Sequence, residues 1–96
     1  MNWDDFVKDE LDYAKSIKME SIRQMALMVN AIVRRRKQLG WSQKEVGDRA
    51  GMTQAQVARL ETQATVPRME TVLKVAIALG LSVSLNEEAA GIRYAI

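Results

Sequence analysis

The sequence predicts an all-α fold, a bundle of five helices followed by one short strand. Two observations favour this class. Apolar residues recur every three to four positions through most of the chain, which is the period of amphipathic helices. Glycines and capping residues divide that pattern into segments. A chain of 96 residues has room for one domain with one modest core.

The first expected domain, residues 1–18, is an acidic amphipathic helix. Asn2 is a suitable N-cap. Apolar residues at helical spacing form one stripe, which consists of Trp3, Phe6, Val7, Leu11 and Ala14. This stripe either packs on the chain's own core or is kept exposed for another protein. The second expected domain, residues 19–81, begins with a long helix that ends at Gly40.

Four cations close this long helix, at positions 34–37. Positive charge at a helix C-terminus contributes a few tenths to about 1 kcal/mol, which is one explanation of the cluster. Contact with phosphates is another. Arg36 differs from its neighbours, because it follows Ile32 by four residues and Val33 by three and therefore turns toward the core. A charge in that position needs a partner.

Two short helices with clear start signals come next. The capping-box pattern occurs twice, at residues 42–45 and 53–56. Between them, Gly51 permits a left-handed backbone and a sharp turn. Two helices of about eight residues joined by a tight glycine turn form a helix-turn-helix. The sequence predicts this motif over residues 43–62.

The C-terminal part begins with a last amphipathic helix, which follows Pro67 and ends at Gly80. The third expected domain, residues 82–96, is a short strand and a loosely held tail. The strand alternates apolar and polar residues, with Leu81, Val83 and Leu85 on one side. Because a lone strand needs a partner, the same segment of a second copy is expected to pair with it across a two-fold axis. An ordered coil packed on the bundle is the alternative.

Charge is distributed unevenly along the chain. Residues 1–20 carry three lysines against six acidic groups, and residues 21–79 carry ten basic groups against four acidic ones. A basic centre suits contact with phosphates. A solvated surface with uneven charge would produce the same count.

Composition excludes most enzyme classes. The chain has no cysteine and no histidine, so it lacks a thiolate nucleophile and the commonest general base and metal ligand. We therefore expect no enzyme, no catalytic residue, no metal and no cofactor. The longest apolar run, Met25–Val29, is too short to span a membrane, and the acidic start lacks a signal-peptide pattern. A cytoplasmic protein without a membrane partner is the expectation.

A family resemblance rests on residues spread over half of the chain. They are Arg36, Leu39-Gly40-Trp41-Ser42-Gln43, Val46, Ala50-Gly51-Met52-Thr53, Val57, Leu60-Glu61, Pro67, Thr71-Val72 and Ala78-Leu79-Gly80. With them, the stretch from Ile32 to Leu81 resembles the lambda-repressor-like helix-turn-helix domain of the Cro/C1, or XRE, type, found in phage repressors and bacterial regulators. The chain departs from the family at Gly47, where alanine is usual, and at Gln63-Ala64, where a glycine is common. The resemblance implies that Arg36 pairs with Glu61.

In such a domain the second helix of the motif enters the major groove of double-stranded DNA. With Val57 and Leu60 turned inward, the opposite face meets the bases. Gln54 is expected to pair with adenine, Arg59 with guanine or a phosphate, and Ala55 is expected to touch a thymine methyl group. Expected contacts to the DNA backbone are Gln43, Thr53, Gln56, Thr62 and Arg68. A homodimer reading half-sites about 34 Å apart on a palindromic operator is the expected working form.

The layout of the whole chain resembles the antitoxins of the HigA type, from type II toxin-antitoxin systems. Such antitoxins neutralise a basic ribonuclease toxin encoded next to them and act as transcriptional repressors of their own operon. The resemblance implies that Trp3, Phe6, Val7 and Leu11 face such a toxin. The alternative is a free-standing repressor of phage or plasmid type, with no toxin partner, in which the same residues complete the core.

Overall fold

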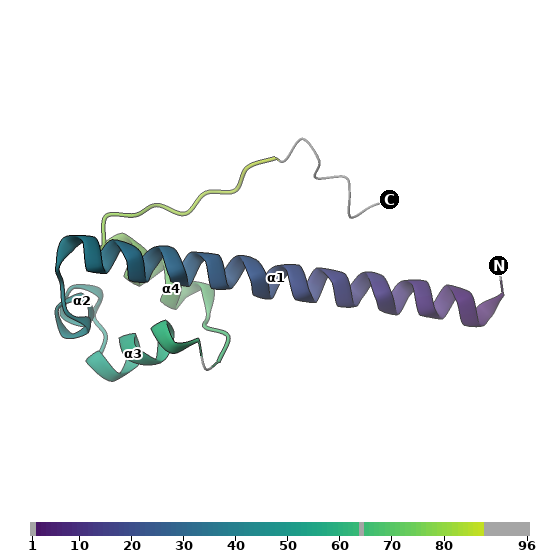
Figure 1. Ribbon diagram of the computed structural model, residues 1–96, viewed down its shortest axis with the longest axis horizontal. Helices are drawn as coiled ribbons and strands as arrows, with labels where there is room; N and C mark the ends of the chain where they lie inside the picture. Colours follow the sequence, from purple (N-terminus) through teal and green to yellow (C-terminus); the bar gives the residue numbers. More distant parts are fainter. Residues whose placement is uncertain (1, 64, 88–96) are drawn as a thin grey trace. The chain divides into compact units, whose positions relative to one another are not determined.

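The computed structural model describes residues 2–63 and 65–87. The described chain forms four helices, which are α1 (Trp3–Leu39), α2 (Gln43–Ala50), α3 (Gln54–Thr62) and α4 (Met69–Ala78) (Figure 1). The backbone divides into two compact units. One is Met25–Ser84, and the described residues of the other are 2–24 and 85–87.

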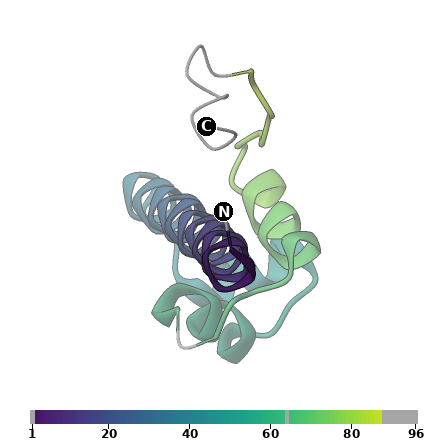
Figure 2. The same cartoon turned by 90° about the vertical axis from the view of Figure 1, so that its right-hand side faces the viewer.

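Every helix contributes to one core in the unit Met25–Ser84. The buried side chains of this core are Val29 and Ile32 of α1, Val46 of α2, Val57 and Leu60 of α3, Val72 and Val75 of α4, and Leu79. Figures 1 and 2 show α2, α3 and α4 gathered around the last turns of α1. Full burial of an aliphatic side chain of this size contributes about 1.5–3 kcal/mol. The core is therefore the main source of stability of this unit.

Glycines end the helices where the sequence predicts. Gly40, Gly51 and Gly80 have φ angles of 71°, 70° and 75°, in the left-handed region. The end of α3 uses Gln63 instead, at a φ of 57°. This is the position at which the sequence lacks the glycine common in the family.

Capping side chains begin the helices. The N–H of Asp5 donates to Asn2 Oδ1 at 2.8 Å, so the predicted cap of α1 is confirmed. The N–H of Glu45 donates to Ser42 Oγ at 3.0 Å at the start of α2. The reciprocal bond of a capping box is absent there, because the Glu45 carboxylate lies 3.4 Å from Arg49 instead.

The turn between α2 and α3 is tight at its inner side. Gly47 is buried, and a Cβ atom at this position would lie 2.6 Å from the carbonyl oxygen of Met52. The missing side chain therefore lets α2 lie directly against the turn that leads into α3.

The described residues contain four helices, so the predicted count of five is wrong. The expected helix of residues 1–18 and the long helix after it are one continuous helix, α1. Neither glycine nor proline occurs between Trp3 and Leu39, so no residue interrupts the hydrogen-bond ladder.

The predicted strand over Leu81–Leu85 is also wrong for the described single chain, because residues 81–87 have no regular secondary structure. A strand requires a second strand to pair with, and no segment of the described chain is extended beside it. The expected tail falls mostly on residues 88–96, which lie outside the described residues. Within residues 2–63 and 65–87, no helix has both the length and the apolar content needed to cross a bilayer.

Candidate nucleic-acid interface

The first element of the site is α3, which the core holds by one face. Val57 is fully buried and Leu60 is 3% exposed. On the opposite face Gln54, Ala55 and Arg59 are exposed to solvent. The three residues predicted to meet bases therefore share the free face of one anchored helix.

A hydrogen bond joins the first residues of α2 and α3. The side-chain Nε2 of Gln54 donates to Gln43 Oε1 at 2.9 Å, and Gln43 Nε2 donates to Glu61 Oε1 at 3.1 Å. Sequence reasoning treated these side chains separately. The signal that was available is that each glutamine is the first residue of its helix, since the glycine turn brings the two helices together.

Arg36 anchors this chain of hydrogen bonds. Its Nε and Nη2 donate to the two carboxylate oxygens of Glu61 at 2.6 and 2.8 Å, and Nη1 donates to the carbonyl of Trp41 at 3.0 Å. The two side chains are 14% and 8% exposed. The residues paired from the family resemblance therefore form a bidentate, largely buried ion pair between α1 and the end of α3.

The ion pair changes the acidity of both groups. The hydrogen bond to Glu61 raises the pKa of Arg36 above its ordinary value, although burial opposes this shift. Burial alone would raise the pKa of Glu61, but hydrogen bonds from Arg36 and Gln43 and the charge of Arg36 lower it. Glu61 is therefore held as a carboxylate, which keeps both of its oxygens as acceptors.

Gln54 keeps the groups that base recognition requires. A side-chain amide carries two N–H donors and one carbonyl oxygen. Only one donor is used on Gln43, so the second N–H and Oε1 of Gln54 remain for a ligand. A glutamine amide in this state can donate to N7 and accept from N6 of adenine.

The predicted backbone contacts lie at the helix ends. Thr53 and Gln56 form a complete capping box, in which Gln56 Oε1 accepts from the N–H of Thr53 at 2.9 Å. The Thr62 hydroxyl donates to the carbonyl of Arg59 at 3.0 Å. Arg68 is exposed at the N-cap of α4. Thr53, Gln56 and Thr62 thus have local roles in α3, and Arg68 is free of them.

The four cations at positions 34–37 have different contacts. Besides Arg36, Arg35 is engaged, because its Nε donates to the carbonyl of Leu79 at 3.0 Å and so caps the end of α4. Arg34 and Lys37 are exposed. Sequence reasoning missed the bond from Arg35, which spans 44 positions of the chain.

The apolar stripe of residues 3–11 is exposed in the N-terminal unit. Trp3 is 74%, Phe6 45% and Leu11 65% exposed, and Val7 is half-buried. The rings of Trp3 and Phe6 stack with centroids 5.8 Å apart. None of these residues belongs to the buried core cluster.

The residues predicted to form a dimer strand differ from one another in exposure. Leu81 packs against the buried core, Val83 is 41% exposed and Leu85 is fully exposed. Leu81 therefore serves the core of this chain, whereas Leu85 contributes nothing to it.

Comparison with known proteins identifies the family of the chain. Residues 32–86 match the family described as helix-turn-helix. An uncharacterized HTH-type transcriptional regulator of Haemophilus influenzae is 31% identical over 84 residues, which cover 88% of this chain and 83% of the relative. No solved structure gives a significant match.

Proposed function

The chain belongs to the helix-turn-helix family of DNA-binding transcriptional regulators, and we propose that α3 reads base edges in the major groove of an operator. One observation carries the proposal. Gln54, Ala55 and Arg59 are exposed on a helix whose other face is anchored in the core. The amide, the methyl group and the guanidinium suit adenine, thymine and guanine, respectively.

Gln43 has a positioning role in this proposal. Its Oε1 holds one N–H of Gln54, which directs the rest of the Gln54 amide outward. Its Nε2 is tied to Glu61, which is in turn held by Arg36. The side chain that meets adenine is therefore ordered before DNA arrives, so binding costs less conformational entropy.

Phosphates of the DNA backbone are proposed to lie at the starts of α2 and α3 and near α4. The first amides of a helix have no partner within it and carry partial positive charge, so they favour an anion. Gln43 lies at such a start, in α2. At the start of α3, Thr53 and Gln56 accept from each other's N–H groups, so the Thr53 hydroxyl hydrogen and the Gln56 Nε2 are the donors that they keep for a phosphate. Thr62 and Arg68 extend the same surface at the end of α3 and the start of α4.

Selection from a random pool of duplex DNA tests the proposal, because such a pool contains the operator whatever its sequence. Gln54→Ala and Arg59→Ala are each expected to lose preference at one base pair, with about tenfold weaker binding of the selected sequence and an unchanged Tm. Lys15→Ala, which removes an exposed charge from the N-terminal unit, is the matched control. Parental affinity and preference in both α3 variants would reject the proposal.

A homodimer on a palindromic operator is the proposed working form. One copy of α3 reads only a few base pairs, so a repressor gains affinity and specificity by joining two copies about one helical turn of DNA apart. The selected sequence is then expected to be two-fold symmetric, with half-sites about 34 Å apart. Sedimentation of the protein–DNA complex gives the stoichiometry, and one chain per duplex would contradict the proposal.

A second proposed function is that of an antitoxin, for which the exposed N-terminal stripe is the specific observation. Trp3, Phe6 and Leu11 are 74%, 45% and 65% exposed, and a group of exposed large apolar side chains is typical of a surface that binds another protein. Acidic residues surround the stripe, which therefore suits a basic protein partner. We propose that this partner is a ribonuclease toxin encoded by the neighbouring gene.

Growth of cells that express the neighbouring gene tests this second function. If the gene product arrests growth alone and co-expression of this chain restores it, the antitoxin proposal is supported, and operator binding becomes autoregulation. If the neighbouring product is harmless, the toxin partner is rejected and the regulator of the first proposal remains.

A further inference from the structure

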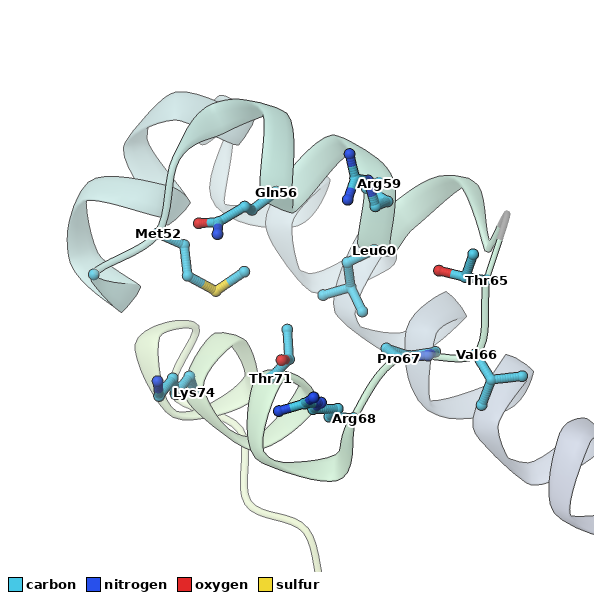
Figure 3. Close-up of a pocket in the computed structure, with 11 residues that line it drawn as sticks. Met52, Gln56, Arg59, Leu60, Thr65, Val66, Pro67, Arg68, Thr71 and Lys74 are labelled. Atoms are coloured by element: carbon cyan, nitrogen blue, oxygen red, sulfur yellow. The ribbon is translucent and has the colours of Figure 1, made fainter.

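A cavity of about 380 Å³ lies between α3 and α4 in the unit Met25–Ser84. Figure 3 shows Met52 and Leu60 on one side and Thr71 on the other, extending toward one another across it. Val66 and Pro67, in the connection between the two helices, add further apolar lining. The volume falls within the range of about 300–1,000 Å³ that is usual for small-molecule sites.

Three cations line this space, which are Arg59 from α3, Arg68 at the N-cap of α4 and Lys74 from α4. No carboxylate is among the described residues that line the cavity. Within residues 2–63 and 65–87, Arg59 and Arg68 take part in no ion pair. Positive charge at the cavity is thus largely uncompensated by the protein.

Lys74 has one neighbouring acid, Glu70, at 3.2 Å on the same helix. Their side chains are 55% and 75% exposed, so this pair is weak and easily exchanged for another anion. Lys74 is therefore available to the cavity at little cost.

The start of α4 adds to the positive electrostatic potential at the cavity. Arg68, at the N-cap, makes no side-chain capping bond. Thr71, which carries a hydroxyl group, lies in the first turn of α4 and lines the cavity. The partial positive charge of a helix N-terminus favours an anion near these residues. The helix N-terminus and the three cations therefore all favour a negatively charged ligand.

We propose that this cavity binds a small organic anion, with a phosphate or carboxylate group at Arg68, Lys74 and Thr71 and an apolar body against Met52 and Leu60. A phosphate of the DNA backbone would use the cations but would leave the apolar lining unoccupied. The combination of apolar lining and cationic rim therefore favours an amphipathic small molecule over a backbone phosphate.

The proposed site also has a consequence for regulation, which rests on the proposed function. Arg68 lines the cavity and is proposed above to contact a phosphate of the DNA backbone. A ligand bound at Arg68 therefore competes with the operator for the same guanidinium. The ligand would act as an inducer, since it lowers the affinity for DNA.

Titration of the DNA-free protein by NMR tests the site. The probes are phenyl phosphate, inorganic phosphate and phenol. Phenyl phosphate is expected to shift the amides of Met52, Leu60 and Thr71 and to bind at least about tenfold more tightly than the other two probes, because only it uses both parts of the site. Arg68→Ala/Lys74→Ala is expected to weaken it at least about tenfold.

Lys44→Ala is the matched control, because this exposed lysine forms a comparable pair with Asp48 at 3.1 Å and does not line the cavity. It is expected to bind phenyl phosphate as the parent does. Equal affinity for phenyl phosphate and inorganic phosphate would overturn the proposal, and so would the absence of localised shifts with all three probes. If only operator binding weakens in the double variant, the rim belongs to the DNA footprint and the ligand site is rejected. Loss of operator binding in Gln54→Ala is measured separately, so the two proposals fail independently.

Discussion

At the scale of single residues, the guanidinium of Arg36 decides how α1 is joined to α3. It makes three hydrogen bonds from a position where its side chain is 14% exposed. Truncation would leave the Glu61 carboxylate largely buried without its cation, and such a loss costs more than the pair itself contributes.

Arg36→Ala is therefore expected to lower the free energy of unfolding by up to about 3 kcal/mol. Urea denaturation at neutral pH measures this change. Lys44→Ala removes one partner of an exposed pair, 76% and 65% exposed, and is expected to change stability by less than about 1 kcal/mol. Weak DNA binding by Arg36→Ala is then a consequence of lost stability rather than a lost contact. If Arg36→Ala has the same free energy of unfolding as the parent, Arg36 has no structural role of this kind.

Glu61 makes stability depend on pH. Its pKa is lower in the folded chain than the ordinary 4.5, so the unfolded chain binds more protons in the interval between the two values. The contribution of the pair is fully present above the ordinary pKa and is lost as the pH falls through the lower, folded value. Glu61→Gln, which cannot titrate, lacks this contribution at every pH.

The parent is accordingly expected to exceed Glu61→Gln in stability at about pH 7, and the difference is expected to shrink as the pH falls below the ordinary pKa of 4.5. Thermal unfolding across this range measures the difference. A gap between parent and variant that stays constant down to about pH 3 would show that protonation of Glu61 does not weaken the pair.

Gln63 offers a test of backbone strain at the end of α3. Its φ of 57° is left-handed, which costs a residue with a Cβ atom about 1 kcal/mol, whereas glycine adopts it freely. Its side chain also donates to Asn30 Oδ1 at 3.1 Å. Since Gln63→Gly and Gln63→Ala both lose this bond, the glycine variant is expected to be the more stable by about 1 kcal/mol in thermal unfolding. Equal stabilities would show that the left-handed angle is not costly here.

At the scale of helices, local signals in the sequence predict where helices start and end but not which residues connect one helix to another. Gly40, Gly51 and Gly80 end helices because a left-handed residue is a local requirement. The break expected near residue 18 had no such signal, since neither glycine nor proline lies there. The hydrogen bonds from Gln54 to Gln43 and from Arg35 to Leu79 depend on how separate helices are placed, so residue spacing alone does not predict them.

The bond between Gln43 and Gln54 leads to a prediction about α2 and α3 together. Gln43→Ala is expected to reduce discrimination at the base pair that Gln54 reads, at a cost in stability of about 1 kcal/mol. The double variant Gln43→Ala/Gln54→Ala is expected to discriminate no worse than Gln54→Ala, because both changes remove one interaction. Binding to duplexes that differ at that single base pair measures this coupling. Additive losses would assign Gln43 a contact of its own, to a phosphate.

At the scale of the whole molecule, the sequence predicts the core unit better than it predicts the two ends. The periodic apolar residues of Met25–Ser84 are buried together, because each helix meets the others there. Residues 81–85 have strand-like alternation but no pairing segment in the described chain, so alternation by itself is insufficient. The helical spacing of Trp3, Phe6 and Leu11 predicts a stripe correctly and leaves its partner undetermined.

Substitutions near the N-terminus of α1 are expected to impair toxin neutralisation without changing stability or DNA binding. Trp3→Ser/Leu11→Ser removes two exposed apolar side chains, 74% and 65% exposed, that no buried residue depends on. The variant is expected to keep the Tm and the affinity for the selected DNA of the parent, because the core and α3 lie in Met25–Ser84. It is expected to lose neutralisation of the neighbouring gene product, since buried apolar anchors carry most of the energy of protein interfaces.

Lys8→Ser/Lys15→Ser, on the same part of α1, is the control for altered helix surface, and it is expected to neutralise as the parent does. Co-expression growth assays and Tm measurements distinguish the outcomes. A lower Tm in Trp3→Ser/Leu11→Ser would mean that the stripe supports the fold of the chain, as in a free-standing repressor. Full neutralisation at an unchanged Tm would place the toxin-binding surface elsewhere on the molecule.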